Sequence, residues 1–151
     1  MRAGINASVT LGQMATIIES ACPPNGYLEQ GGGGIETAGA TVAVNDMLLH
    51  SWEGFLRLFP VWPVSDDASF SGLRAVGAFV VSASLRSGKL AHARITSEAG
   101  LPCTIHWPWG ATLTVTDAET GAVVVAKPVK IGRTDRLWRF ETSSGQSCFL
   151  S

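Results

Sequence analysis

The chain has 151 residues, enough for one domain or for one small domain with an attached fragment. Only 15% of the residues are charged, against about a quarter in typical globular proteins. A net charge of −1 and a pI near 6.3 leave no basic stripe for phosphates, so nucleic acid is not expected as a partner. No run approaches the ~18 to 20 apolar residues of a membrane helix, and the N-terminus lacks a signal-peptide pattern, so no membrane partner is expected.

The N-terminal part of the chain has the period of helices. From Ile5 to about Ala21 apolar residues recur at three- and four-residue steps, and the breakers of residues 22–26 end the run. A second helix is predicted from about Ala38 to His50, after the glycines of residues 31–34. Two helices of about fifteen residues cannot bury their apolar faces alone. We therefore expect this segment to pack on the rest of the chain or to form a homo-oligomer.

After Trp52 the pattern becomes that of short strands separated by glycine-containing turns. The predicted strands are 55–59, 73–85, 90–96, 103–107, 112–116, 123–130, 137–140 and 147–150. Gly77 lies inside the second of these, which predicts a β-bulge there. Regularly spaced short strands are typical of an antiparallel sandwich. The sequence therefore predicts a mainly β fold, with a helical segment over residues 1–51 and a β-sandwich domain over 52–151.

The cysteines and histidines do not predict a metal site. Cys22, Cys103 and Cys148 are odd in number and have no CxxC spacing, so zinc is not expected. Three buried thiols and a Cys103–Cys148 bridge both remain open. The three histidines are too scattered to form a ligand set, and no cofactor is expected.

Trp107-Pro108-Trp109 is the most conspicuous local feature. Two tryptophans on a loop, with His106 beside them, could form a platform for the apolar faces of sugar rings. The alternative is that Trp107 and Trp109 bury their large area where the sandwich meets the helices. Carbohydrate is thus a possible ligand, and Trp107, Trp109 and His106 are its candidate binding residues.

Several passages together resemble glycoside hydrolase family 95, the α-L-fucosidase family. The segment 45–63, NDMLLHSWEGFLRLFPVWP, resembles the family's passage E-M-L-L-Q-S-x-x-G-x-I-x-L-L-P-A-L-P. GLRAVGAF at 72–79 is similar to its strand G-L-R-A-R-G-G-F, and FETSSGQSCFL at 140–150 to its closing F-x-T-x-x-G-x-x-Y-x-L. The resemblance runs from about Gly31 to the C-terminus and implies the last helices of an (α/α)6 barrel followed by a C-terminal β-sandwich.

The family hydrolyses terminal α-L-fucose with inversion, which requires an acid and a base. The resemblance implies one acidic residue in the loop before the second helix, where Glu36 is the carboxylate at hand, in Ile-Glu-Thr-Ala-Gly instead of the family's I-D-G-N-F-G-G. The family's general acid and assisting asparagines lie farther upstream. The resemblance thus implies a C-terminal structural domain that is not a working glycosidase by itself. The alternatives are an independent carbohydrate-binding module, or an oligomer that assembles a shared site around Glu36.

Overall fold

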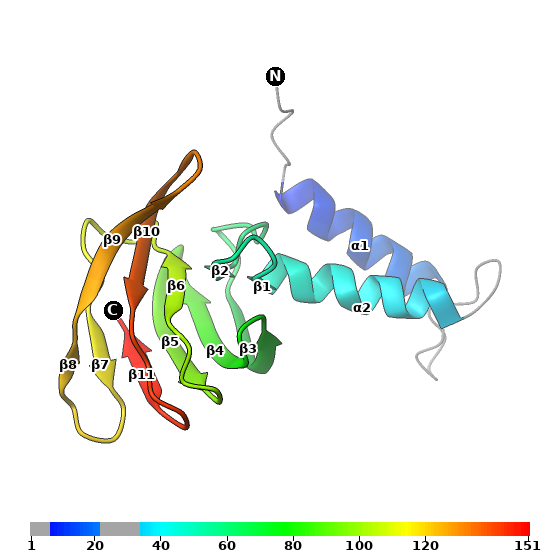
Figure 1. Cartoon of the computed structure of the whole chain (residues 1–151). Helices are drawn as coiled ribbons and strands as arrows, with labels where there is room; N and C mark the ends of the chain where they lie inside the picture. The colour runs from blue at the N-terminus through cyan, green and yellow to red at the C-terminus, as the bar shows by residue number, and fades with distance from the viewer. Residues whose placement is uncertain (1–6, 22–33) are drawn as a thin grey trace.

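The computed structural model describes residues 7–21 and 34–151. Helices α1 (Ala7–Ala21) and α2 (Gly34–Leu48) precede a region of strands, and Figure 1 shows them projecting from one side of it. The strands are β1 (Leu49–His50), β2 (Arg57–Leu58), β3 (Ala68–Ala75), β4 (Phe79–Arg86), β5 (Lys89–Ser97), β6 (Cys103–His106), β7 (Val115–Asp117), β8 (Val123–Val124), β9 (Ala126–Ile131), β10 (Thr134–Phe140) and β11 (Ser147–Leu150). None of the described helices is both long and apolar enough to cross a membrane.

Nine of the strands form two packed antiparallel sheets, and β1 and β2 form a separate two-stranded ladder. The larger has the order β3-β4-β5-β11-β7-β8 and the smaller the order β6-β10-β9. The smaller sheet lies over the larger one in Figure 1. The predicted mainly β fold with antiparallel sheets and a short helical segment is therefore confirmed. The predicted boundary between residues 51 and 52, and self-association through the helices, stay predictions.

Alternating burial builds the core between the two sheets. In β4, Phe79, Val81, Ala83 and Leu85 point inward, and the residues between them are more exposed. Both sheets supply fully buried side chains to the same cluster, among them Ile95, Cys103, Ile105, Val115, Phe140 and Cys148. Burial raises the pKa of the Cys103 and Cys148 thiols, and both are free. Of the two readings left open by the sequence, the structure thus has buried thiols at these two positions, while Cys22 lies outside the described residues.

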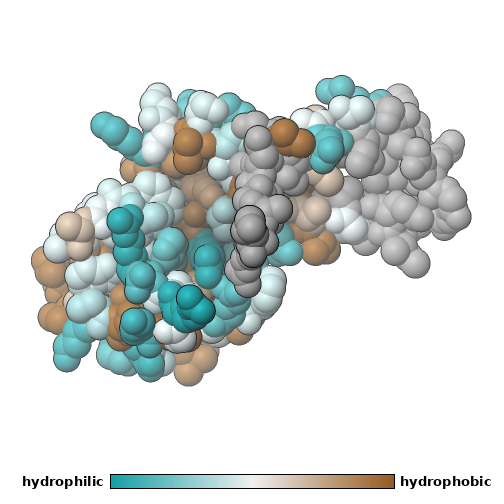
Figure 2. Space-filling view, turned by 90° about the horizontal axis from the view of Figure 1, so that it is seen from above, coloured by the Kyte–Doolittle hydropathy of each residue, from teal (hydrophilic) through white to brown (hydrophobic). Residues whose placement is uncertain are grey.

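The surface of the sandwich is mixed in character. In the view from above, hydrophobic and hydrophilic groups alternate over it and do not gather in one large apolar face (Figure 2). Singly exposed apolar residues such as Val64 and Val123 are ordinary on a protein surface.

The ends of the second helix differ from the prediction. α2 begins at Gly34, earlier than the predicted Ala38, because a glycine is tolerated in a first turn whose N–H groups have no helical partner. It ends at Leu48 instead of His50, because Leu49 and His50 pair with Leu58 and Arg57 in the β1–β2 ladder. Tertiary pairing thus overrides the helical pattern at this end.

The predicted strand 73–85 is wrong, since the structure divides it into β3 and β4. Gly77, with a φ of 90°, and Ala78, with a φ of 57°, form the turn between them. The predicted bulge at Gly77 is therefore also wrong, because a positive φ at successive residues reverses the chain. The irregularity in this ladder lies between Phe70 and Leu73 instead.

The predicted strand 123–130 is wrong in the same sense. Its first part, β8, pairs with β7 in the larger sheet, and its second part, β9, pairs with β10 in the smaller one. The chain crosses from one sheet to the other at Val125, which is 69% exposed. Strands that change sheet in this way form the corners of a sandwich.

Candidate functional site

The tryptophans singled out by the sequence have different environments. Trp107 follows β6 directly and is 3% exposed, and its backbone N–H donates to the Arg136 carbonyl at 2.8 Å. It continues the inward face of Cys103 and Ile105, so its ring belongs to the core. Trp109 is half-buried and meets the Trp107 ring edge-on, with centroids 5.3 Å apart at 71°. Trp107 therefore supports the ring of Trp109, and Trp109 is the one of the pair that lines open space.

A hollow of about 350 Å³ lies beside Trp109, and we call it the tryptophan cleft. It is lined by Trp62, Trp109, His106 and Arg57, with apolar side chains of 58–60, 64 and 85 and with Gly88 and Pro108. Trp62 lies on the loop after β2, where its Nε1–H donates to the Asp66 carbonyl at 3.1 Å. The cleft thus has a half-buried tryptophan from each of two distant segments and a small set of polar groups.

Two contacts bring these segments together. The N–H of Leu56 donates to the Thr104 carbonyl, and the N–H of His106 donates to the Leu56 carbonyl, both at 2.8 Å. Leu56 therefore lies parallel to Ile105 at the edge of β6. This bridge places Arg57 and the loop carrying Trp62 next to the end of β6, where His106 and Trp109 follow.

The polar groups of the cleft are an imidazole and a guanidinium. Burial lowers the pKa of His106, and the positive charges of Arg57 and Arg136 lower it further. His106 is therefore neutral at pH 7 and offers one donor and one acceptor nitrogen. Arg57 binds Glu53 at 2.6 Å and lies 4.7 Å from the centre of the Phe55 ring. Its Nε is buried and has no hydrogen-bond partner among the described residues.

This combination of groups is typical of a small-molecule site. Such sites are mostly apolar and aromatic, with a few placed polar groups that orient the ligand. Indole rings offer flat apolar faces, and the neutral imidazole can bind hydroxyl groups as donor and as acceptor. The sequence analysis predicted His106 and Trp109 as binding residues. It missed Trp62 and Arg57, because no sequence signal places these two residues next to His106 and Trp109.

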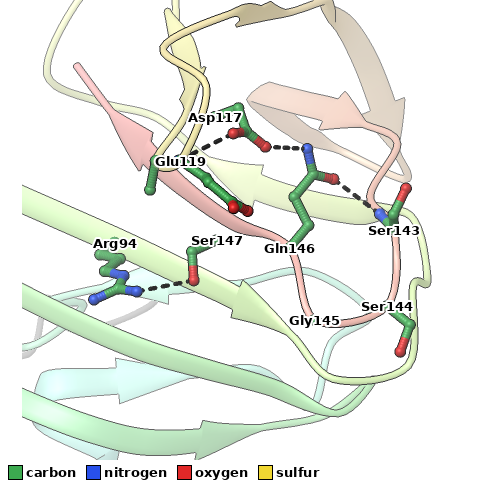
Figure 3. Close-up of a pocket in the computed structure, with 9 residues that line it drawn as sticks. Arg94, Asp117, Glu119, Ser143, Ser144, Gly145, Gln146 and Ser147 are labelled. Atoms are coloured by element: carbon green, nitrogen blue, oxygen red, sulfur yellow. Dashed lines mark hydrogen bonds between the residues drawn. The ribbon is translucent and has the colours of Figure 1, made fainter.

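A further hollow lies at the ends of β5, β7 and β11, with a volume of about 630 Å³ (Figure 3). Its central carboxylate, Asp117, accepts hydrogen bonds from the backbone N–H groups of Glu119 and Thr120, from the Thr120 hydroxyl and from Gln146 Nε2 at 2.7 Å. Gln146 Oε1 in turn accepts from the N–H of Ser143. Asp117 thus links the turn after β7 to the turn before β11. Its carboxylate oxygens accept hydrogen bonds from within the fold.

The Asp117 contacts predict a pH dependence of stability. The hydrogen bond from Gln146, followed by those from Thr120, lowers the pKa of Asp117 to about 2. A lowered folded-state pKa stabilises the fold above the ordinary carboxyl value of about 4, and this contribution is lost as pH falls from there toward the folded value. The difference in melting temperature between wild type and Asp117→Asn should therefore be largest near neutral pH and shrink below pH ~4. Asp135→Asn, which removes an exposed carboxylate from β10, is the control, and a constant difference for Asp117→Asn across this range would contradict the prediction.

The remaining predicted site residue is Glu36. The structure places its backbone in the first turn of α2 instead of in a loop before the helix, and its side chain lies outside the described part of the chain. Its catalytic role stays a prediction. Among the described residues, no three His, Cys, Asp or Glu side chains gather where they could hold a metal ion.

Comparison with known proteins assigns the family. The model of the glycoside hydrolase family 95 C-terminal domain matches residues 50–150, from the second residue of β1 to the end of β11. No curated protein matches the chain. This match confirms the resemblance found in the sequence, and the chain belongs to glycoside hydrolase family 95, of which it contains the C-terminal domain.

Proposed function

We propose that this C-terminal domain binds carbohydrate in the tryptophan cleft and does not hydrolyse glycosides by itself. The observation that carries the proposal is that Trp62 and Trp109 line one hollow together with a neutral His106. Membership of a glycoside hydrolase family makes a glycan the expected ligand of such a cleft. The domain would then hold a glycan while a catalytic part of the enzyme acts on it.

The lack of hydrolysis follows from the groups in the cleft. An inverting glycosidase needs two carboxyl groups about 6.5–9.5 Å apart, one as acid and one as base. Among the described residues that line the cleft there is no Asp or Glu. The nearest carboxylate along the chain to Arg57 is Glu53, and it is engaged in the ion pair with that arginine. A histidine and an arginine do not replace the pair, so the cleft supports binding and not cleavage.

Binding is tested on a glycan array, and the affinity for each glycan that binds is then measured by calorimetry. Trp109→Ala should weaken binding about 30-fold or more, since loss of a central aromatic contact typically costs about 2 kcal/mol or more. Trp52→Ala is the matched control, because Trp52 is 68% exposed and does not line the cleft. Equal affinities for wild type and Trp109→Ala, or no binding to any glycan of the array, would overturn the proposal.

Hydrolysis is tested separately with p-nitrophenyl α-L-fucoside and a panel of related aryl glycosides. The isolated chain should release no p-nitrophenol above the rate without protein, because the cleft lacks the carboxylate pair. Glu36→Gln is measured beside wild type. Turnover by wild type that disappears in Glu36→Gln would contradict the proposal and would support a site assembled around Glu36.

A further inference from the structure

Another hollow also borders Trp109. Its volume is about 440 Å³, and Trp138, Pro128 and Arg136 contribute to its lining together with Trp109 itself. Pro128 on β9 stands directly opposite Trp138 on β10 in the ladder. We call this hollow the Arg136 hollow. Since Trp109 and Pro108 line both hollows, the two are neighbours along one surface that carries three tryptophans.

The backbone of Arg136 has an unusual conformation. Its φ is 56°, a conformation that a residue with a Cβ adopts at a cost. The β9–β10 ladder is irregular between Thr134 and Leu137, so Arg136 is displaced from regular pairing. One of its guanidinium nitrogens donates to the Pro108 carbonyl at 3.5 Å, next to Trp109. The irregular ladder thus holds a guanidinium beside Trp109, which lines both hollows.

The charged side chains that line the two hollows are both arginines. Arg57 lines the tryptophan cleft and Arg136 lines the Arg136 hollow, and no Asp or Glu is found among the described residues that line either. Arg57 is partly neutralised by Glu53, whereas Arg136 makes no ion pair with any described residue. An anionic group in the Arg136 hollow would therefore meet a guanidinium that has no carboxylate partner within the described chain.

We infer that the binding site runs across Trp109 into the Arg136 hollow and takes an acidic oligosaccharide, with one sugar in the tryptophan cleft and a carboxylate- or sulfate-bearing sugar beside Arg136. The inference rests on the proposed function, because it extends the same site. Three tryptophans along one surface suit a chain of sugars better than a single one, since each sugar unit has its own apolar face to cover. Arg136 supplies the charge-assisted hydrogen bonds that distinguish an acidic unit from a neutral one.

The test compares acidic and neutral oligosaccharides of equal length by calorimetry at low salt. The probes are tetragalacturonate and its methyl ester, a sulfated fucose tetrasaccharide and its desulfated form, and the corresponding monosaccharides. At least one acidic tetrasaccharide should bind about tenfold more tightly than its neutral form, and the preference should fall as salt rises. The pair that shows the preference distinguishes carboxylate from sulfate.

Arg136→Gln should remove the preference for the acidic form, so that the acidic and the neutral tetrasaccharide bind with similar affinity. Arg133→Gln, in the exposed turn between β9 and β10, is the control for a general loss of positive charge. Equal binding of acidic and neutral forms, with Trp109→Ala still weakening both, would overturn this inference and leave the proposed function standing. Equal loss for Arg136→Gln and Arg133→Gln would overturn it as well, and absence of binding to every probe and every glycan of the array would overturn both proposals.

Discussion

Phe140→Ala should lower the free energy of unfolding by about 3–5 kcal/mol, the range for removing a fully buried phenylalanine. Phe140 is 1% exposed and belongs to the buried cluster between the sheets. It stands on β10, the middle strand of the smaller sheet, opposite Cys103 on one side and Ala126 on the other. Since both neighbouring strands are held by this ladder, the site has little freedom to collapse around the missing ring.

Urea denaturation followed by circular dichroism measures the effect, and Phe149→Ala provides the control. Phe149 on β11 is 40% exposed and contacts His92 at a ring distance of 5.5 Å, so its removal should cost less than about 1 kcal/mol. If Phe140→Ala does not fold, Phe140→Leu should still fold, with a loss of about 1.5 kcal/mol. Similar losses for Phe140→Ala and Phe149→Ala would contradict the packing of the two sheets on each other.

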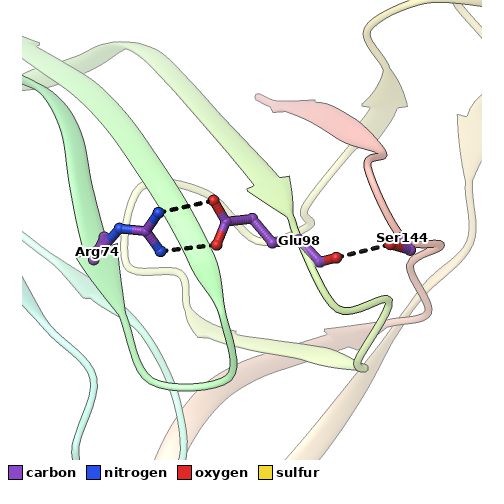
Figure 4. A network of polar contacts seen from close by, with 3 residues as sticks. All are labelled: Arg74, Glu98 and Ser144. Atoms are coloured by element: carbon purple, nitrogen blue, oxygen red, sulfur yellow. Dashed lines mark hydrogen bonds and ion pairs between the residues drawn. The ribbon is translucent and has the colours of Figure 1, made fainter.

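Gly100→Ala should destabilise the domain by about 2–5 kcal/mol, from a strained backbone and a collision together. Gly100 has a φ of 70°, and a Cβ there would lie 2.8 Å from the Ser144 nitrogen and 3.2 Å from the Ser143 carbonyl carbon. Both are backbone atoms, so the turn between β10 and β11 would have to move. That movement would strain the 2.7 Å hydrogen bond from the Ser144 hydroxyl to the Glu98 backbone carbonyl. The side chain of the same Glu98 forms the ion pair with Arg74 that Figure 4 shows.

Gly121→Ala is a matched control for the second prediction. Gly121 has nearly the same φ, 72°, but an added Cβ would have no atom of the described residues within 4 Å. It should therefore lose only the conformational cost of about 1–2 kcal/mol. Thermal unfolding of both variants separates the two contributions. Equal losses would show that the turn at Ser143 and Ser144 does not press on Gly100.

The fold class was predictable because the β region carries its pattern locally. β4 alternates between buried and less buried residues, and Ser87-Gly88 marks the turn into β5, with φ values of 48° and 74°. The division at Gly77 was harder, because the turn there carries none of the asparagine, aspartate or proline that usually marks one. The change of sheet at Val125 has no local signal, since both β8 and β9 read as the same kind of strand.

The candidate site was predictable in part. The outward position of His106 and the burial of Trp107 follow from the alternation that begins at Cys103, and that signal was available in the sequence. Trp62 and Arg57 reach the same cleft only through the Leu56–Ile105 bridge. A pairing between distant segments depends on the whole fold, so the sequence showed half of the cleft and the structure supplies the other half.

The most direct measurement on the proposed binding site is an NMR titration that follows the indole N–H signals of the five tryptophans. With an oligosaccharide that binds in calorimetry, we expect the largest shifts at Trp62 and Trp109, with Trp52 unchanged. An acidic oligosaccharide should shift Trp138 as well. A glycan that binds while the signals of Trp62 and Trp109 stay in place, or that shifts Trp52 most, would contradict carbohydrate binding in the tryptophan cleft.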